Sequence, residues 1–106
     1  MTDPIQPTRI VLVDDHAIVR RGLRVYLESY PGLQIVGEAA SAEEALHHLP
    51  EWGADVVILD LLLPGGMDGI EATGHICSML AAPRVIILTA FTDDARVVGA
   101  LRQGAI

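Results

Sequence analysis

Three short runs of β-branched and leucine residues stand out in the chain, at residues 10–13, 56–59 and 85–88. Each run is apolar at every position rather than at alternate ones, and each is bounded by polar or turn residues. Uninterrupted apolar runs of this length are typical of strands covered on both faces, as in a parallel sheet. Residues 34–39 form a weaker candidate, which we place nearer an edge of that sheet.

Segments with helical periodicity follow these candidate strands. The first begins after Asp15, and its apolar and aromatic positions share one face: Val19, Leu23, Tyr26 and Leu27. The second begins with Ser41 and Glu44 in a capping-box pattern. The third begins behind Asp68 and has a stripe made of Ile70, Thr73, Cys77 and Leu80. The fourth runs from about residue 92 to a glycine stop at Gly104.

This alternation of strand and helix predicts an α/β fold with right-handed crossovers. We expect residues 1–8, which contain Pro4 and Pro7, to be a short mobile arm, and residues 9–106 to form the domain. Because no complete strand follows the fourth helix, either Ile106 begins a fifth strand that is cut off or the fold ends unusually early, and we favour the first interpretation. The strand at residues 85–88 would then be an exposed apolar edge, which favours dimerisation or strand exchange.

Composition narrows the class of protein. The 106 residues are 51% hydrophobic and 20% charged, which suits one folded domain. The net charge of −7 argues against direct binding of nucleic acid. The apolar runs are far shorter than the ~20 residues that cross a bilayer, and the N-terminus has no signal-peptide pattern. A single cysteine, Cys77, fits a reducing compartment, so we expect a cytoplasmic protein without membrane contact.

Carboxylates follow two of the candidate strands directly. Asp14 and Asp15 come after the first run, and Asp60 comes after residues 56–59. Ligands of open parallel sheets bind at the carboxyl ends of the strands, so a strand order of 2-1-3-4 would bring these three acids together. They would repel one another unless a cation joined them. Oxygen ligands with room for water favour Mg²⁺ over Ca²⁺ or zinc.

The hydroxyl of Thr89 suggests that the site beside these acids binds a phosphoryl group. Thr89 follows the run at residues 85–88, where it could donate a hydrogen bond to a phosphoryl oxygen, and the small Ala90 leaves space beside it. Residues 64–69 form a glycine-containing loop over the site. These features together suggest a carboxylate that accepts a phosphoryl group beside Mg²⁺.

Four ordered motifs carry a family resemblance: Val-Leu-Val-Asp-Asp-His at 11–16, Val-Ile-Leu-Asp-Leu-Leu-Leu-Pro at 57–64, Met-Asp-Gly at 67–69 and Leu-Thr-Ala at 88–90. They resemble the receiver domain of two-component response regulators, over residues 8–106, and are most similar to the NarL/FixJ subfamily. The resemblance implies a doubly wound, flavodoxin/CheY-like parallel sheet of order 2-1-3-4-5. It also implies a LuxR-type helix-turn-helix output domain beyond this chain.

The same resemblance implies a role for each matched residue. Asp60 would be the phosphoacceptor, and Thr89 the switch hydroxyl. Asp15 would bind Mg²⁺ directly and Asp14 mainly through water, with Asp60 and the Leu62 carbonyl as further ligands. The donor would be a phosphohistidine of a sensor histidine kinase, and DNA would be bound only through the output domain. Such a module is not a turnover enzyme.

Two departures from the family pattern matter. All seven basic residues are arginines, so the family's lysine at the end of the fifth strand is missing. The loop with Gly65 and Gly66 is one residue longer than the commonest form. The missing lysine leaves open an alternative, a phosphorylation-independent pseudo-receiver that serves as a binding or dimerisation module. A haloacid-dehalogenase type of phosphohydrolase is disfavoured, because Asp60 is not followed by a second acid two residues later.

Several polar residues have simpler interpretations. We expect His16 to be a solvated helix start and Asp68 to be a helix cap. We expect the basic residues of the first helix, Arg20, Arg21 and Arg24, to form a solvated face. We expect Cys77 to be a core residue. Gly74, inside the third helix, should cost about 1 kcal/mol against alanine, with no compensating reason in the sequence.

Overall fold

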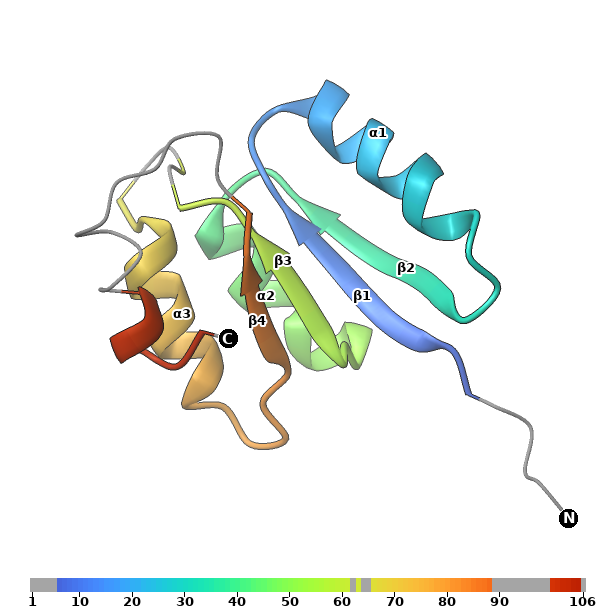
Figure 1. The fold of residues 1–106 in the computed structure, drawn as a ribbon. Coiled ribbons are helices and arrows are strands. Elements are labelled where there is room, and N and C mark those ends of the chain that lie inside the picture. Colours follow the sequence, from blue (N-terminus) through green and yellow to red (C-terminus); the bar gives the residue numbers. More distant parts are fainter. Residues whose placement is uncertain (1–5, 62, 64–65, 89–99, 106) are drawn as a thin grey trace, which may run out of the picture.

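Four parallel strands form one sheet in the order β2-β1-β3-β4. The computed structural model describes residues 6–61, 63, 66–88 and 100–105. Its strands are β1 (Thr8–Val13), β2 (Leu33–Ala39), β3 (Val56–Leu59) and β4 (Arg84–Ile87), and they alternate with the helices α1 (Ala17–Glu28), α2 (Ala42–Trp52) and α3 (Gly69–Cys77) (Figure 1). The expected α/β class and the strand order 2-1-3-4 are confirmed, with β2 at an edge. The β1 strand begins at Thr8, inside the segment expected to be an arm.

Side-chain caps mark the beginnings of α2 and α3. The Glu44 amide donates to the Ser41 hydroxyl at 3.1 Å, while the Glu44 carboxylate accepts from the Ala40 amide at 3.4 Å rather than from the cap residue itself. The Asp68 carboxylate accepts from the Glu71 amide at 3.0 Å. The predicted caps Ser41 and Asp68 are therefore confirmed, because their oxygens satisfy donors that a helix start leaves free.

The predicted fourth helix begins outside the described residues, but its end is described. Residues 100–102 are helical, and Gly104 has a φ of 114°. The Gly104 amide donates to the Leu101 carbonyl, and the Ala105 amide donates to the Ala100 carbonyl. This pair of bonds is a Schellman motif, so Gly104 is confirmed as the helix stop.

The sheet buries side chains on both of its faces. One core lies between the sheet and the helices α2 and α3, and its fully buried strand members are Val11, Val13, Ala39, Val57, Leu59 and Val85. The other core joins strand residues to α1, and its members include Ile10, Leu12, Ile35, Leu23 and Leu27. Helices thus lie on opposite sides of the sheet, as Figure 1 shows, which is the arrangement of a doubly wound fold.

The expectation that every apolar run is covered on both faces is wrong for β4. Burial alternates along β4, where Val85 is buried and Ile86 is 40% exposed, and Leu88 just after it is 43% exposed. The reason is that α1 packs over β1 and β2, and among the described residues no helix covers this face of β3 and β4 (Figure 1).

Two of the predicted apolar helix faces also need correction. In α1, Leu23 and Leu27 pack against the sheet, whereas Val19 is 40% and Tyr26 is 61% exposed. Tyr26 lies instead against the ring of Tyr30, with the two hydroxyls 3.0 Å apart. Leu80 lies beyond the end of α3 and is 98% exposed, so it does not continue that helix's buried stripe.

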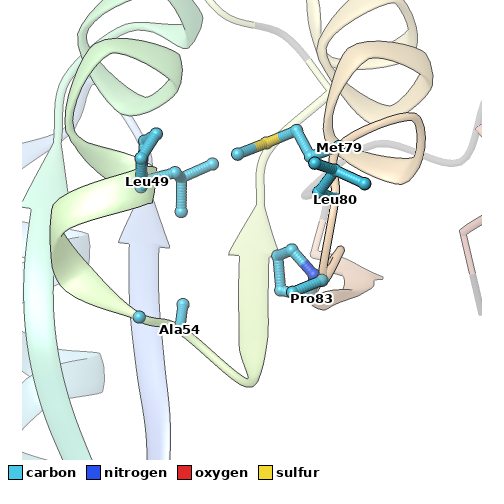
Figure 2. A pocket seen from close by; sticks show the side chains of 8 residues that line it. Leu49, Ala54, Met79, Leu80 and Pro83 are labelled. Atoms are coloured by element: carbon cyan, nitrogen blue, oxygen red, sulfur yellow. The ribbon is translucent and has the colours of Figure 1, made fainter.

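A small apolar pocket of about 120 Å³ lies at the amino ends of β3 and β4, away from the strand ends that carry the acids. Figure 2 shows the Leu49 and Met79 side chains extending toward each other across it, with Ala54 and Pro83 below. Within the part of the chain that the structure describes, no helix combines the length and the apolar character that crossing a membrane requires.

Candidate functional site

The register between β1 and β3 brings the predicted acids together. Val13 is paired with Leu59, so the residues that follow them, Asp14 and Asp60, leave the sheet side by side. The Asp60 amide donates to the Val13 carbonyl at 3.0 Å, which extends the pairing one residue beyond β3. On the other side, the Asp14 amide donates to the Ala39 carbonyl at the end of β2, at 3.1 Å. The site therefore lies at the carboxyl ends of three neighbouring strands.

Four side chains converge at this place. One carboxylate oxygen from each of Asp14, Asp15 and Asp60 and one ring nitrogen of His16 all lie within 4.8 Å of one another. Asp14 is buried, with 7% of its surface exposed, while Asp60 is half-buried and Asp15 is exposed. The three acids thus converge as the sequence predicted. The cluster they form is open to solvent on the side of Asp15, while the Asp14 carboxylate is buried.

His16 interacts with the acid cluster more closely than the sequence indicated. His16 does cap α1 and its side chain is 64% exposed, as expected of a solvated helix start. Its Nδ1 nevertheless lies 2.8 Å from Asp14 Oδ1 and 3.1 Å from Asp15 Oδ1. The hydrogen bond with Asp14, followed by the charge of Asp15, raises the pKa of His16 above 6.5. A protonated imidazole therefore offsets part of the repulsion between the carboxylates.

The set of ligand atoms fits a hard cation. Three carboxylates with one open side offer oxygen ligands and leave positions for water, which is the coordination that Mg²⁺ prefers. One imidazole, that of His16, joins the acids. Zinc sites are usually built from several histidine or cysteine ligands, so a single imidazole does not make this a zinc set.

Arg20 is not the solvated residue that the sequence predicts, whereas Arg24 is exposed as expected but is paired. Arg20 is 19% exposed, and its Nε donates to Glu38 in β2 at 3.2 Å. Its Nη1 donates to the Asp14 carbonyl at 2.6 Å. Arg24 is also paired with Glu38, on the other carboxylate oxygen. No sequence signal identifies these pairs, because Glu38 lies 18 and 14 residues from the two arginines.

A close backbone approach fixes the other side of the site. The Gly69 amide, at the start of α3, donates to the Leu61 carbonyl at 3.0 Å. A Cβ atom on Gly69 would lie 2.5 Å from the Asp60 carbonyl oxygen and 2.5 Å from Leu61 Cα. Only glycine allows the helix to start this close to the residue that follows β3, so the Met-Asp-Gly motif has a steric reason here.

Some predicted site residues lie outside the described residues. These are Leu62, whose carbonyl was expected to bind metal, and Thr89 with its neighbour Ala90. Residues 64 and 65 of the predicted loop are also outside the described part, whereas Met67 packs against the main core. His47 and His75 are exposed, and the half-buried His48 stacks on Trp52.

A protein-family model matches most of the chain. The model described as the response regulator receiver domain matches residues 10–106. The transcriptional regulatory protein LiaR of Bacillus subtilis is 43% identical over 98 residues, which cover 92% of this chain and 46% of that protein. The DNA-binding transcriptional activator DevR/DosR of Mycobacterium tuberculosis is 42% identical over 97 residues and is covered to 44%. The chain therefore spans about half the length of these relatives.

A solved structure has the same fold. A two-component response regulator of the LuxR family from Aurantimonas sp. SI85-9A1 superposes with a TM-score of 0.86 at 45% sequence identity. The match covers 94% of this chain and 71% of that one. At this identity and coverage, the similarity extends from the fold to the family.

Proposed function

Because the chain belongs to the response regulator receiver family, we propose that it is a phosphoacceptor module in which Asp60 takes a phosphoryl group from a phosphohistidine of a sensor histidine kinase. The observation that supports this role is the convergence of Asp60 with two other carboxylates at the carboxyl ends of β1 and β3. Asp60 is half-buried, so its carboxylate is held by the fold and still accessible to a donor.

The proposed reaction is an in-line substitution at phosphorus. An Asp60 carboxylate oxygen attacks the phosphorus atom, and the bond from phosphorus to the donor's histidine nitrogen breaks. The electron pair of that bond stays on the imidazole nitrogen, and Asp60 becomes an acyl phosphate. Water later attacks this phosphorus, which releases inorganic phosphate and restores the carboxylate. The module thus carries a phosphoryl group and does not turn over an external substrate.

Asp14, Asp15 and Asp60 would hold Mg²⁺ at this site, Asp15 directly and Asp14 mainly through water, with the Leu62 carbonyl as a further ligand. When bound, Mg²⁺ neutralises charge that develops on the phosphoryl oxygens. Thr89 would be the switch hydroxyl that hydrogen-bonds the transferred group. Its position directly after the apolar run at residues 85–88 supports this assignment.

We place the module in a cytoplasmic transcription regulator. The relatives LiaR and DevR/DosR are transcriptional regulators by name, and about half of each lies outside the match. DNA would then be bound through a C-terminal helix-turn-helix in the whole protein, because the acidic chain described above repels a phosphate backbone. The partners that we propose for the module itself are a sensor histidine kinase and a second copy of this chain.

Phosphorylation of the chain by an acyl phosphate donor tests the proposal directly. With Mg²⁺ present, we expect intact mass spectrometry to show one added phosphoryl group, and we expect Asp60→Asn to show none. Asp68→Asn is the matched control, because asparagine caps a helix as well as aspartate does and Asp68 is an N-cap next to the same loop. That variant should be phosphorylated like the wild type.

The other outcomes contradict the proposal in distinct ways. An adduct that persists in Asp60→Asn would mean that a different residue is the acceptor. An adduct of equal yield after chelation of the metal would remove Mg²⁺ from the mechanism. The absence of any adduct, both in this chain and in the longer protein, would favour the phosphorylation-independent binding module.

A further inference from the structure

The peptide unit between Asp14 and Asp15 is held from outside the acid cluster. Its carbonyl, that of Asp14, accepts a hydrogen bond from Arg20 Nη1 at 2.6 Å. The Asp14 amide is bonded to the Ala39 carbonyl of β2 at 3.1 Å. Because a peptide unit is planar, holding the Asp14 carbonyl also sets the direction in which the chain enters Asp15.

Glu38 holds the arginine that makes this contact. It lies in β2 directly before Ala39, and its Oε1 accepts from Arg20 Nε at 3.2 Å. Its other oxygen accepts from Arg24 in the next turn of α1. Arg20 is thus clamped between a strand side chain and the β1–α1 turn, with 19% of its side chain exposed.

A clamp is needed here because the turn carries repelling charges. The carboxylate oxygens of Asp14, Asp15 and Asp60 lie within 4.8 Å of one another, so their repulsion opposes this arrangement of the turn when no cation is bound. The charge of Arg20 is itself balanced by Glu38. Its main effect on the acids is therefore to fix their position rather than to neutralise them.

We infer that Arg20 is a positioning residue, which acts with Glu38 to hold Asp14 and Asp15 in the arrangement that binds a divalent cation beside Asp60. The role in cation binding rests on the proposed function, whereas the contacts of Arg20 with Glu38 and the Asp14 carbonyl are present in the structure. Other arginine positions on α1 do not make this contact: Arg24 reaches Glu38 and Glu28, and Arg21 is exposed.

Titration with Mg²⁺ alone, followed by calorimetry, tests the inference without a phosphodonor. Loss of a residue that orients metal ligands commonly costs 10–100-fold in metal affinity, so we expect Arg20→Gln to raise the Kd roughly tenfold. Arg20→Lys keeps the charge but loses the planar fork that spans Glu38 and the Asp14 carbonyl, and we expect a similar loss. Arg21→Gln removes the same charge from an exposed neighbour and should leave the Kd within about twofold.

A double variant of Arg20 and Glu38 distinguishes the loss of their mutual contact from a general loss of stability. Glu38→Gln should weaken Mg²⁺ binding as well, and the pair Arg20→Gln with Glu38→Gln should be no weaker than Arg20→Gln alone. At saturating Mg²⁺, the rate of phosphorylation of Arg20→Lys should equal that of the wild type, because the bound cation then holds the acids together. A merely destabilised variant would lose rate at every Mg²⁺ concentration.

Amide hydrogen exchange gives a readout that does not depend on the metal. In Mg²⁺-free buffer, the Asp14 amide of Arg20→Lys should exchange roughly tenfold faster than in the wild type, since the turn has lost a charge-assisted hydrogen bond. Unchanged exchange, a wild-type Kd in Arg20→Lys, or an equal loss in Arg21→Gln would each overturn the inference. Faster exchange in a protein that binds no Mg²⁺ would support the clamp and instead contradict the proposed metal site.

Discussion

At the scale of single residues, glycines decide how closely the segments around the site approach. Gly69 lies against the backbone of Asp60 and Leu61, as described above. Gly74, which had no rationale in the sequence, lies under the side chain of Gln103: a Cβ there would meet its Oε1 at 2.6 Å. That atom is the end of a flexible side chain, which can move aside, so this contact does not require a glycine in α3.

We predict opposite effects for two glycine-to-alanine substitutions. Gly69→Ala should destabilise the fold by about 1–3 kcal/mol, because the clash is with backbone atoms that cannot move aside alone. Gly22→Ala, in the exposed middle of α1 with nothing within 4 Å, should stabilise it by about 0.5–1 kcal/mol. Urea unfolding measures both. Equal stability of Gly69→Ala and the wild type would contradict the close approach.

The titration of His16 reports on the acids beside it. Its raised pKa is caused first by the hydrogen bond with Asp14 and then by the charge of Asp15. In Mg²⁺-free buffer we expect NMR to give a pKa above 6.5, and Asp14→Asn to lower it toward that value. A wild-type pKa at or below 6.5 would show that the contact does not form in solution. Asp55→Asn, at the opposite end of β3, should have no effect.

The sign of the pH dependence follows from that shift. The folded pKa is higher than the unfolded one, so His16 contributes stability that is fully present below pH 6.5. This contribution is lost as the pH rises through the folded pKa. We expect the difference in stability between the wild type and His16→Gln to shrink over this interval, as measured by urea unfolding at several pH values.

At the scale of elements, the helix ends are specified locally and the strand surroundings are not. Ser41, Asp68 and Gly104 begin or end their helices as the sequence predicted, since a cap bonds to residues only a few positions away. The β4 strand has the same apolar pattern as β1, yet only β1 is covered on both faces. The environment of β4 depends on where α1 packs, and a four-residue apolar pattern does not encode that.

The cap of α2 gives a prediction at this scale. Ser41→Ala removes the acceptor of the Glu44 amide and should cost about 1 kcal/mol of stability. Ser41→Asp keeps an acceptor at the cap and adds a negative charge at the helix start, so its stability should stay near that of the wild type. Thermal or urea unfolding distinguishes the two. Equal losses in both variants would mean that the hydroxyl acts through another contact.

At the scale of the whole molecule, the two cores are unequal. The face with α2 and α3 contains most of the buried residues, while α1 has no fully buried side chain among its residues. On the same side of the sheet as α1, β4 and the residue after it expose Ile86 and Leu88. Among the described residues β4 pairs only with β3, so an apolar strand edge is available for association.

We predict that this chain associates at high concentration through the β4 edge. Ile86→Lys should reduce the association, because a charged side chain at a strand edge opposes pairing with another chain. Ile18→Lys is the control, since Ile18 is 86% exposed on α1, away from β4. Light scattering and sedimentation over a range of concentrations measure the effect. A wild-type chain that stays monomeric throughout would contradict the prediction.

The strands, the helix caps and the position of the acids directly after two strands can be predicted from the sequence, because periodicity and capping act between residues close in the chain. The strand order came only from the family resemblance. The tertiary structure decided the register of Val13 with Leu59, which sets Asp14 beside Asp60. It also decided the contacts of Arg20 with Glu38 and the Asp14 carbonyl. Such contacts form only when the sheet brings distant segments together, so no local pattern encodes them.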